Sequence, residues 1–150
     1  MDFREGYEGL EEEAGAMRAY YLKEAMDRED RKQALRWLGQ VMREIDKETP
    51  FDAVAVTGLS GLLMGPVVAD RLGKGIIVVR KEGEKNHSGY AIESSVSGKY
   101  VIVDDFISTG ATIRRIVDNV GEGCVGICLY AKRRGVEFGH WNGIPMRRRQ

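Results

Sequence analysis

The spacing of apolar residues changes once along the chain, near residue 50. Before this point, apolar side chains recur at the intervals of one helix face, at Leu35, Leu38, Val41, Met42 and Ile45. A capping box of Asp30 with Gln33 would begin this helix. Thr49 before Pro50 would end it, because the residue before proline avoids the helical region. We therefore expect residues 1–48 to form a helical N-terminal segment.

After residue 50 the apolar positions come in short runs that do not alternate cleanly with polar ones. These runs predict strands at 53–56, 76–79, 100–103 and 125–130, with helices between them at 62–72 and 111–120. Unbroken apolar strands indicate a sheet covered on both faces, which usually means parallel pairing. The order strand, helix, strand predicts an α/β fold, a parallel sheet of about four to five strands flanked by helices.

Composition and charge narrow the classes of function. The chain has 150 residues, of which 43% are hydrophobic, and this fits one domain with a core at 51–130 and a tail at 131–150. Lys plus Arg and Asp plus Glu number 23 each, so a nucleic-acid partner is not expected. No apolar run could span a membrane, and residues 1–5 do not resemble the start of a signal peptide. We expect a cytoplasmic protein without a membrane partner.

The two cysteines, Cys124 and Cys128, fall in one predicted strand. Four strand residues separate them by roughly 13 Å, which is too far for a disulfide between them. A metal site would lack a second pair of ligands. We therefore expect both thiols to pack in the core.

Two acidic residues stand at the end of the third predicted strand. Ligands of such sheets bind outside the carboxyl ends of the strands, where Asp104 and Asp105 are followed by Ser108, Thr109, Gly110, Ala111 and Thr112. Adjacent carboxylates repel each other unless a cation or hydroxyl donors offset the repulsion. The free N–H groups of a helix that begins at residues 109–112 suit a phosphate. A sugar phosphate would fit both features, whereas an acidic metal pair or a simple helix cap are the alternatives.

Two other strands are followed by segments that suit anions. The first strand ends in Thr57-Gly-Leu-Ser-Gly61, where small residues before a helix allow close approach of an anion, although a tight turn explains the glycines equally well. Arg80, Lys81 and Lys85 follow the second strand with His87. These groups suit a diphosphate, and a solvated charged loop is the alternative.

A resemblance to a known family decides among these interpretations of the acid pair and the anion-binding segments. The stretch Tyr100-Val-Ile-Val-Asp-Asp-Phe-Ile-Ser-Thr-Gly-Ala-Thr112 resembles the diphosphate-sugar motif of type I phosphoribosyltransferases over thirteen residues. The resemblance implies that Asp104 and Asp105 hold the ribose hydroxyls and magnesium, and that residues 108–112 cradle the 5-phosphate. It places residues 57–61 in the diphosphate loop, with Leu59, Ser60 and Gly61 as binding residues. The family often has a cis peptide bond in this loop, and the resemblance implies one at Leu59–Ser60.

The segment 80–89 resembles the mobile catalytic loop of orotate phosphoribosyltransferases. It implies that Arg80, Lys81, Lys85 and His87 meet the diphosphate, and that the protein is a homodimer because that loop covers the neighbouring subunit. One extra residue before Lys85 and Ser60 in place of a basic residue depart from that family. Loop closure would exclude water from the site.

The implied activity is the magnesium-dependent transfer of a phosphoribosyl group from 5-phosphoribosyl-1-diphosphate to a nucleobase, of the orotate type. A purine enzyme is an alternative, with Lys132 and Phe138 or Trp141 at the base and 131–150 as a hood. Packing of these aromatic side chains over the sheet edge explains them equally well. A regulatory protein that senses the sugar or a nucleotide is another. We expect residues 147–149, three arginines, to be a solvated tail.

Overall fold

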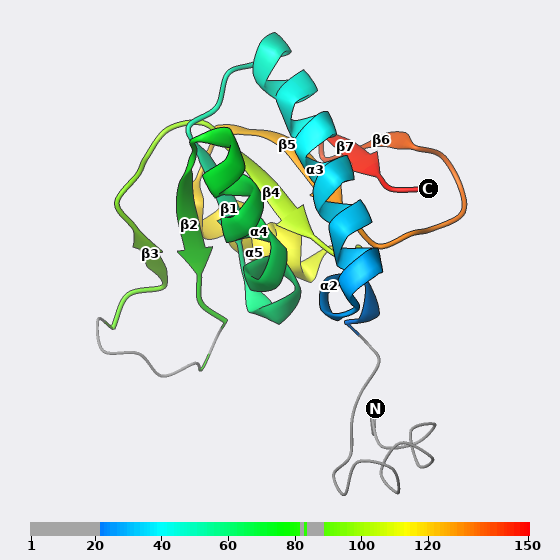
Figure 1. Ribbon diagram of the computed structural model, residues 1–150. Coiled ribbons are helices and arrows are strands. Elements are labelled where there is room, and N and C mark those ends of the chain that lie inside the picture. The colour runs from blue at the N-terminus through cyan, green and yellow to red at the C-terminus, as the bar shows by residue number, and fades with distance from the viewer. Residues whose placement is uncertain (1–21, 82, 84–88) are drawn as a thin grey trace, which may run out of the picture.

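The computed structural model describes residues 22–81, 83 and 89–150, and its centre is a seven-stranded sheet in the order β3-β2-β1-β4-β5-β7-β6 (Figure 1). The strands are β1 (Ala53–Val56), β2 (Gly75–Val79), β3 (Ile92–Ser94), β4 (Tyr100–Asp104), β5 (Cys124–Leu129), β6 (Phe138–Trp141) and β7 (Ile144–Arg148). The five inner strands are parallel, whereas β3 and β6 pair antiparallel at the two edges. The predicted α/β class and parallel sheet are confirmed, with more strands than expected.

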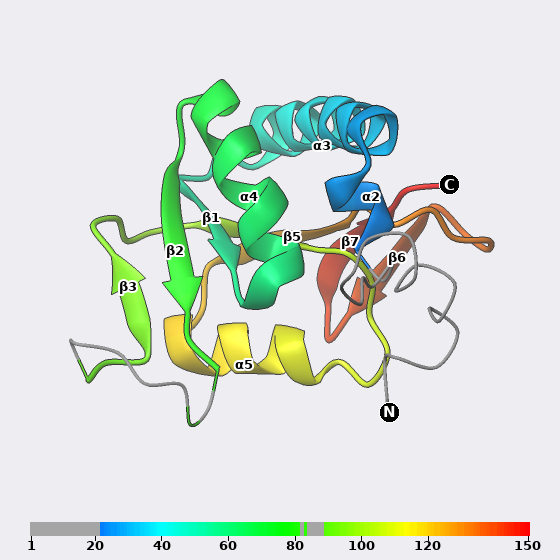
Figure 2. The same cartoon turned by 60° about the horizontal axis from the view of Figure 1, so that its bottom comes forward.

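Helices cover both faces of the sheet. They are α2 (Lys23–Met26), α3 (Arg28–Glu48), α4 (Gly58–Leu72) and α5 (Ala111–Val120). Figure 2 shows α3 and α4 on one face and α5 on the other. Within β1, Val54 and Val56 pack towards α3 and α4, whereas Ala53 and Ala55 pack with the α5 side of the core. Because side chains on both faces of β1 are fully buried, the sequence of this strand is one unbroken apolar run.

Helix α3 begins earlier than its predicted cap. Asp27 is the N-cap, and its side chain accepts a hydrogen bond from the backbone N–H of Asp30. Asp30 therefore lies in the first turn, and the capping box of Asp30 with Gln33 was wrong. Thr49 is the C-cap, as expected for a residue before proline.

The thiols of Cys124 and Cys128 are both free, and Cys128 is fully buried.

The C-terminal residues belong to the sheet rather than to a solvated tail. Strand β7 pairs parallel with β5, and β6 returns antiparallel to it. Arg147 and Arg148 lie in β7, and Arg149 is only 5% exposed. The prediction for these arginines was wrong because backbone pairing with β5 holds the segment in place.

The helices were also compared with the length and apolar character that a membrane span requires. None of the helices in the described residues meets both requirements.

Candidate active site

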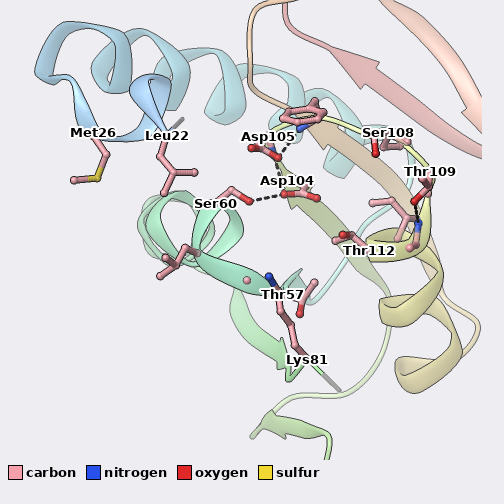
Figure 3. A pocket seen from close by; sticks show the side chains of 17 residues that line it. Leu22, Met26, Thr57, Ser60, Lys81, Asp104, Asp105, Ser108, Thr109 and Thr112 are labelled. Carbon is pink, nitrogen blue, oxygen red and sulfur yellow. Dashed lines mark hydrogen bonds between the residues drawn. The ribbon is translucent and has the colours of Figure 1, made fainter. Parts of the chain in front are cut away.

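A cavity of about 680 Å³ opens where β1, β2 and β4 end. Four segments far apart in sequence line it (Figure 3). The lining residues are Leu22, Met26, Thr57, Gly58, Leu59, Ser60, Lys81, Asp104, Asp105, Phe106, Ile107, Ser108, Thr109, Gly110, Ala111, Thr112 and Ile113. The location at the carboxyl ends of parallel strands is where ligands of such sheets bind.

The acid pair lies at the floor of this cavity. Asp104 is 5% exposed, and its Oδ1 accepts hydrogen bonds from the Ser60 hydroxyl at 2.7 Å and from the Asp105 N–H at 2.9 Å. Asp105 Oδ1 accepts from the Phe106 N–H at 2.7 Å. Burial, assisted by the Asp105 charge and opposed by the Ser60 bond, raises the pKa of Asp104 to about 7. A bound cation or hydroxyl donors would stabilise its charged form.

The N-terminus of α5 forms one wall. Gly110 is its N-cap with a φ of 84°, and this residue makes no side-chain capping bond. Thr109 Oγ1 accepts from the Ala111 N–H at 3.3 Å. A Cβ on Gly110 would stand 2.8 Å from Trp141 Nε1, so both backbone conformation and packing require glycine here. The open N–H groups and hydroxyls of residues 108–112 can bind a phosphate.

The N-terminus of α4 forms the opposite wall. Thr57 is the N-cap, but its hydroxyl donates to the Val79 carbonyl, and no side chain caps the helix. Leu59 and Ser60 therefore stand in an uncapped first turn that faces the cavity, a second position that suits an anion. The expected cis bond at Leu59–Ser60 was wrong, since the chain has no cis peptide bond in its described part and these residues have helical backbone.

Gly61 differs from its neighbours, because it is not among the residues that line the cavity. A Cβ on Gly61 would lie 2.9 Å from Val56 Cβ and 3.1 Å from the Val103 carbonyl oxygen. Its lack of a side chain therefore allows α4 to approach β1 and β4 closely. Its contribution to the site is this close packing.

The cationic segment after β2 is only partly brought to the cavity. Lys81 lines it, and its side chain lies beside Gly58. Arg80 does not line it, and its Nη2 stands 3.4 Å from Glu93 Oε1. Lys85 and His87 lie outside the described residues, so their predicted roles stay predictions.

Sequence reasoning missed part of the cavity lining. Phe106 and Ile107 line it, and their apolar character within the acidic motif was the available signal. Leu22 and Met26 also line it, and no local pattern indicated this.

The aromatic residues and Lys132 proposed for the base are not among the lining residues. Trp141 packs behind Gly110. The Phe138 ring lies 4.2 Å from the Arg147 guanidinium. Arg133 reaches the site only indirectly, through a guanidinium 4.0 Å from the Phe106 ring.

Comparison with known proteins identifies relatives of one kind. No family model matches the chain. It is 34% identical to the adenine phosphoribosyltransferase of Bifidobacterium longum over 106 residues, which are 58% of this chain and 55% of the relative. It is 36% identical over 81 residues to the orotate phosphoribosyltransferase of Pyrobaculum islandicum, covering 53% of this chain and 42% of the relative. The chain thus spans about half the length of the curated relatives it matches.

Solved structures show the same fold. The adenine phosphoribosyltransferase of Thermoanaerobacter pseudethanolicus superimposes with a TM-score of 0.53 at 24% identity, over 77% of this chain and 76% of that one. The orotate phosphoribosyltransferase of Aeropyrum pernix gives 0.56 at 20% identity, over 76% of this chain and 66% of that one. The resemblance to type I phosphoribosyltransferases is confirmed. The likeness of the loop to orotate enzymes stays a prediction, because adenine and orotate enzymes both match.

Proposed function

We propose that the protein transfers a phosphoribosyl group from 5-phosphoribosyl-1-diphosphate to a nucleobase and releases diphosphate. The observation that carries this proposal is the convergence of two helix N-termini, whose N-cap residues make no side-chain capping bond, on one buried acid pair in a single cavity. Two anion sites on either side of carboxylates match a sugar that carries phosphate groups at both ends. The relatives of this chain are named for the same reaction class.

Each part of the cavity has a separate task in this proposal. The first turn of α5 binds the 5-phosphate, and the first turn of α4 with Lys81 binds the diphosphate. Asp104 and Asp105 accept hydrogen bonds from the ribose hydroxyls. As the bond to diphosphate breaks, positive charge grows on the ribose ring, and the two carboxylates stabilise it by preorganised electrostatics.

Magnesium fits the donor set of the acid pair. Mg²⁺ prefers oxygen ligands and is usually held by one or two carboxylates together with substrate phosphates. Asp104 and Asp105 would hold it, and it would neutralise charge on the leaving diphosphate. Within the described part of the chain, no group of three or more acidic, His or Cys side chains forms a metal cluster.

For the base we put a neutral purine, adenine, before orotate. Leu22, Met26, Phe106 and Ile107 contribute apolar side chains to the lining of the cavity. Among the described lining residues Lys81 is the only cation, and it stands at the diphosphate wall. Orotate carries a carboxylate that needs a cation, so it remains the second candidate, supported by the sequence of the loop and by the orotate relative.

The test is to incubate the protein with Mg²⁺, 5-phosphoribosyl-1-diphosphate and each of adenine, hypoxanthine, guanine, xanthine, uracil and orotate, and to follow nucleotide formation. Turnover with adenine supports the proposal in full, and turnover with orotate alone reverses the order of the bases. Asp105→Asn should abolish turnover, whereas Asp118→Asn, which removes an exposed carboxylate of α5, should not.

Isothermal titration with the sugar separates the remaining outcomes. Binding without turnover of any base would favour a regulatory sensor, and no binding would refute the proposal. Sedimentation of the same sample tests the homodimer, which rests only on the resemblance of the loop.

A further inference from the structure

Tyr130 connects the α4 wall of the cavity to the end of β4, where the acid pair lies. It follows β5 and is 1% exposed. Its hydroxyl donates to the Ser60 carbonyl oxygen at 2.6 Å, across a sequence separation of 70 residues. Its backbone N–H donates to the Asp104 carbonyl oxygen at 3.1 Å. One residue is thus bonded both to the first turn of α4 and to the end of β4.

Ser60 completes the connection on the side of the cavity. Its carbonyl oxygen accepts from Tyr130, while its hydroxyl donates to Asp104 Oδ1 at 2.7 Å. Burial raises the pKa of Tyr130 well above its usual value, so its hydroxyl keeps the proton that it donates at neutral pH. The position of the α4 turn relative to the acid pair therefore depends on a chain of two hydrogen bonds that begins at Tyr130.

The C-terminal segment holds Tyr130 in turn. Arg149 is buried, and its guanidinium donates to the Tyr130 carbonyl oxygen at 3.3 Å and to Gln33 Oε1 at 3.4 Å. The Arg149 N–H donates to the Leu129 carbonyl oxygen at 3.0 Å. The backbone of Tyr130 is thus hydrogen-bonded at both its N–H and its carbonyl group. These bonds fix the position from which its hydroxyl reaches Ser60.

We propose that Tyr130 is a positioning residue of the site. It holds the first turn of α4 at a set distance from Asp104, so that the diphosphate-binding N–H groups and the ribose-binding carboxylate are arranged before the sugar arrives. This proposal rests on the proposed function for its ligand. Loss of one such bond should weaken sugar binding about threefold to tenfold, since a typical buried hydrogen bond contributes about that factor.

The test compares Tyr130→Phe with Tyr100→Phe. Tyr100 is a matched control because it is also fully buried, and its hydroxyl donates to the Gly121 carbonyl oxygen at 2.6 Å, at the opposite end of β4. Both variants lose one hydroxyl and one bond to a carbonyl group. We expect Tyr130→Phe alone to raise KM and Kd for 5-phosphoribosyl-1-diphosphate, while its KM for the base stays that of wild type.

A second variant and a second readout keep the proposal testable. In a double-mutant cycle, Ser60→Ala should reduce the effect of Tyr130→Phe, because both act on one chain of bonds. Hydrogen exchange of the peptide that spans residues 57–64 should be faster in Tyr130→Phe and unchanged in Tyr100→Phe.

Three results would overturn either the role of Tyr130 or the proposed function. Sugar affinity in Tyr130→Phe equal to that in Tyr100→Phe overturns the proposal, as does unchanged exchange at 57–64. If wild type binds no sugar, the proposed function fails. The exchange comparison then still decides whether Tyr130 fixes the turn of α4, so the two failures are distinguishable.

Discussion

Replacing Asp104 by Asn should stabilise the folded protein at neutral and alkaline pH while it removes sugar binding. The carboxyl of Asp104 is 5% exposed, and burial, with the charge of Asp105, raises its pKa from 3.8 to about 7. The ionised form is therefore unfavourable in the fold. Asn keeps an oxygen that can accept from the Ser60 hydroxyl and the Asp105 N–H, but it carries no charge.

The size of the effect follows from the shift. Three pKa units correspond to about 4 kcal/mol at 1.36 kcal/mol per unit, which is an upper limit. Because the folded pKa is raised, the folded protein holds a proton that the unfolded chain has lost between about pH 4 and about pH 7. The stability of wild type therefore falls as pH rises through this window and stays low above it. The variant should lack this fall.

The assay is urea unfolding followed by circular dichroism from about pH 4 to about pH 8, where the linear extrapolation gives the free energy of unfolding. We expect the variant to gain about 2–4 kcal/mol over wild type at the alkaline end and little at the acid end. Asp118→Asn, at an exposed position of α5, is the control and should change stability by less than about 0.5 kcal/mol at any pH.

A difference between variant and wild type that does not depend on pH would refute the reasoning, because it would show that the Asp104 carboxyl titrates alike in the folded and unfolded states. A loss of stability at alkaline pH would refute it too. The same variant should no longer bind 5-phosphoribosyl-1-diphosphate in a titration, since Asn has no charge to offer the ribose hydroxyls and magnesium. Stability and binding should thus change in opposite directions.

Two further substitutions test the phosphate wall and the core. Gly110→Ala should weaken binding of the sugar tenfold or more by titration, because its φ of 84° costs a non-glycine residue roughly 1–2 kcal/mol and the new Cβ meets Trp141. Gly135→Ala, with a φ of 115° and nothing within 4 Å, should leave binding unchanged. Leu38→Ala, at a fully buried site of α3, should lower the free energy of unfolding by about 2–5 kcal/mol, measured with urea; a loss below about 1 kcal/mol would contradict its place in the core.

Local patterns were sufficient for the elements that lie in the middle of the fold. The helix at 111–120 was predicted with its observed bounds, and four inner strands were predicted to within one residue at each end. These elements are buried against layers on both sides, so apolar runs and helical spacing follow directly from burial. The start of helix α4 was predicted too late, because the glycine and serine residues of its first turn are typical of a loop.

The last two strands of the chain, β6 and β7, could not be predicted in the same way. Residues 138–141 alternate between exposed and half-buried positions, and residues 144–148 end in two arginines. Neither has the unbroken apolar run of β1 or β4. They form because the backbone of residues 146–148 pairs with that of 127–129, a contact that no local window contains. Arg149 is buried for the same reason, although its type is mostly found at the surface.

Part of the candidate site could likewise be predicted from local sequence, and part depends on contacts between distant segments. The acid pair and the turn proposed to bind phosphate lie within one stretch of nine residues, 104–112, so one motif predicts them both. Their distance from the α4 turn depends on contacts between distant segments. A side chain at Gly61 or Gly65 would collide with Val56, so these glycines allow α4 to lie close against β1.

That close packing brings the Ser60 hydroxyl to Asp104 and the Ser60 carbonyl oxygen to Tyr130. A sugar with phosphate groups at both ends requires two anion sites at a set separation. In the proposed site, one anion-binding turn comes from a contiguous motif, and the other is positioned by helix packing and one tyrosine. Substitutions in the motif should therefore remove binding of a group outright, whereas substitutions at Gly65 or Tyr130 should leave both sites intact and alter the distance between them.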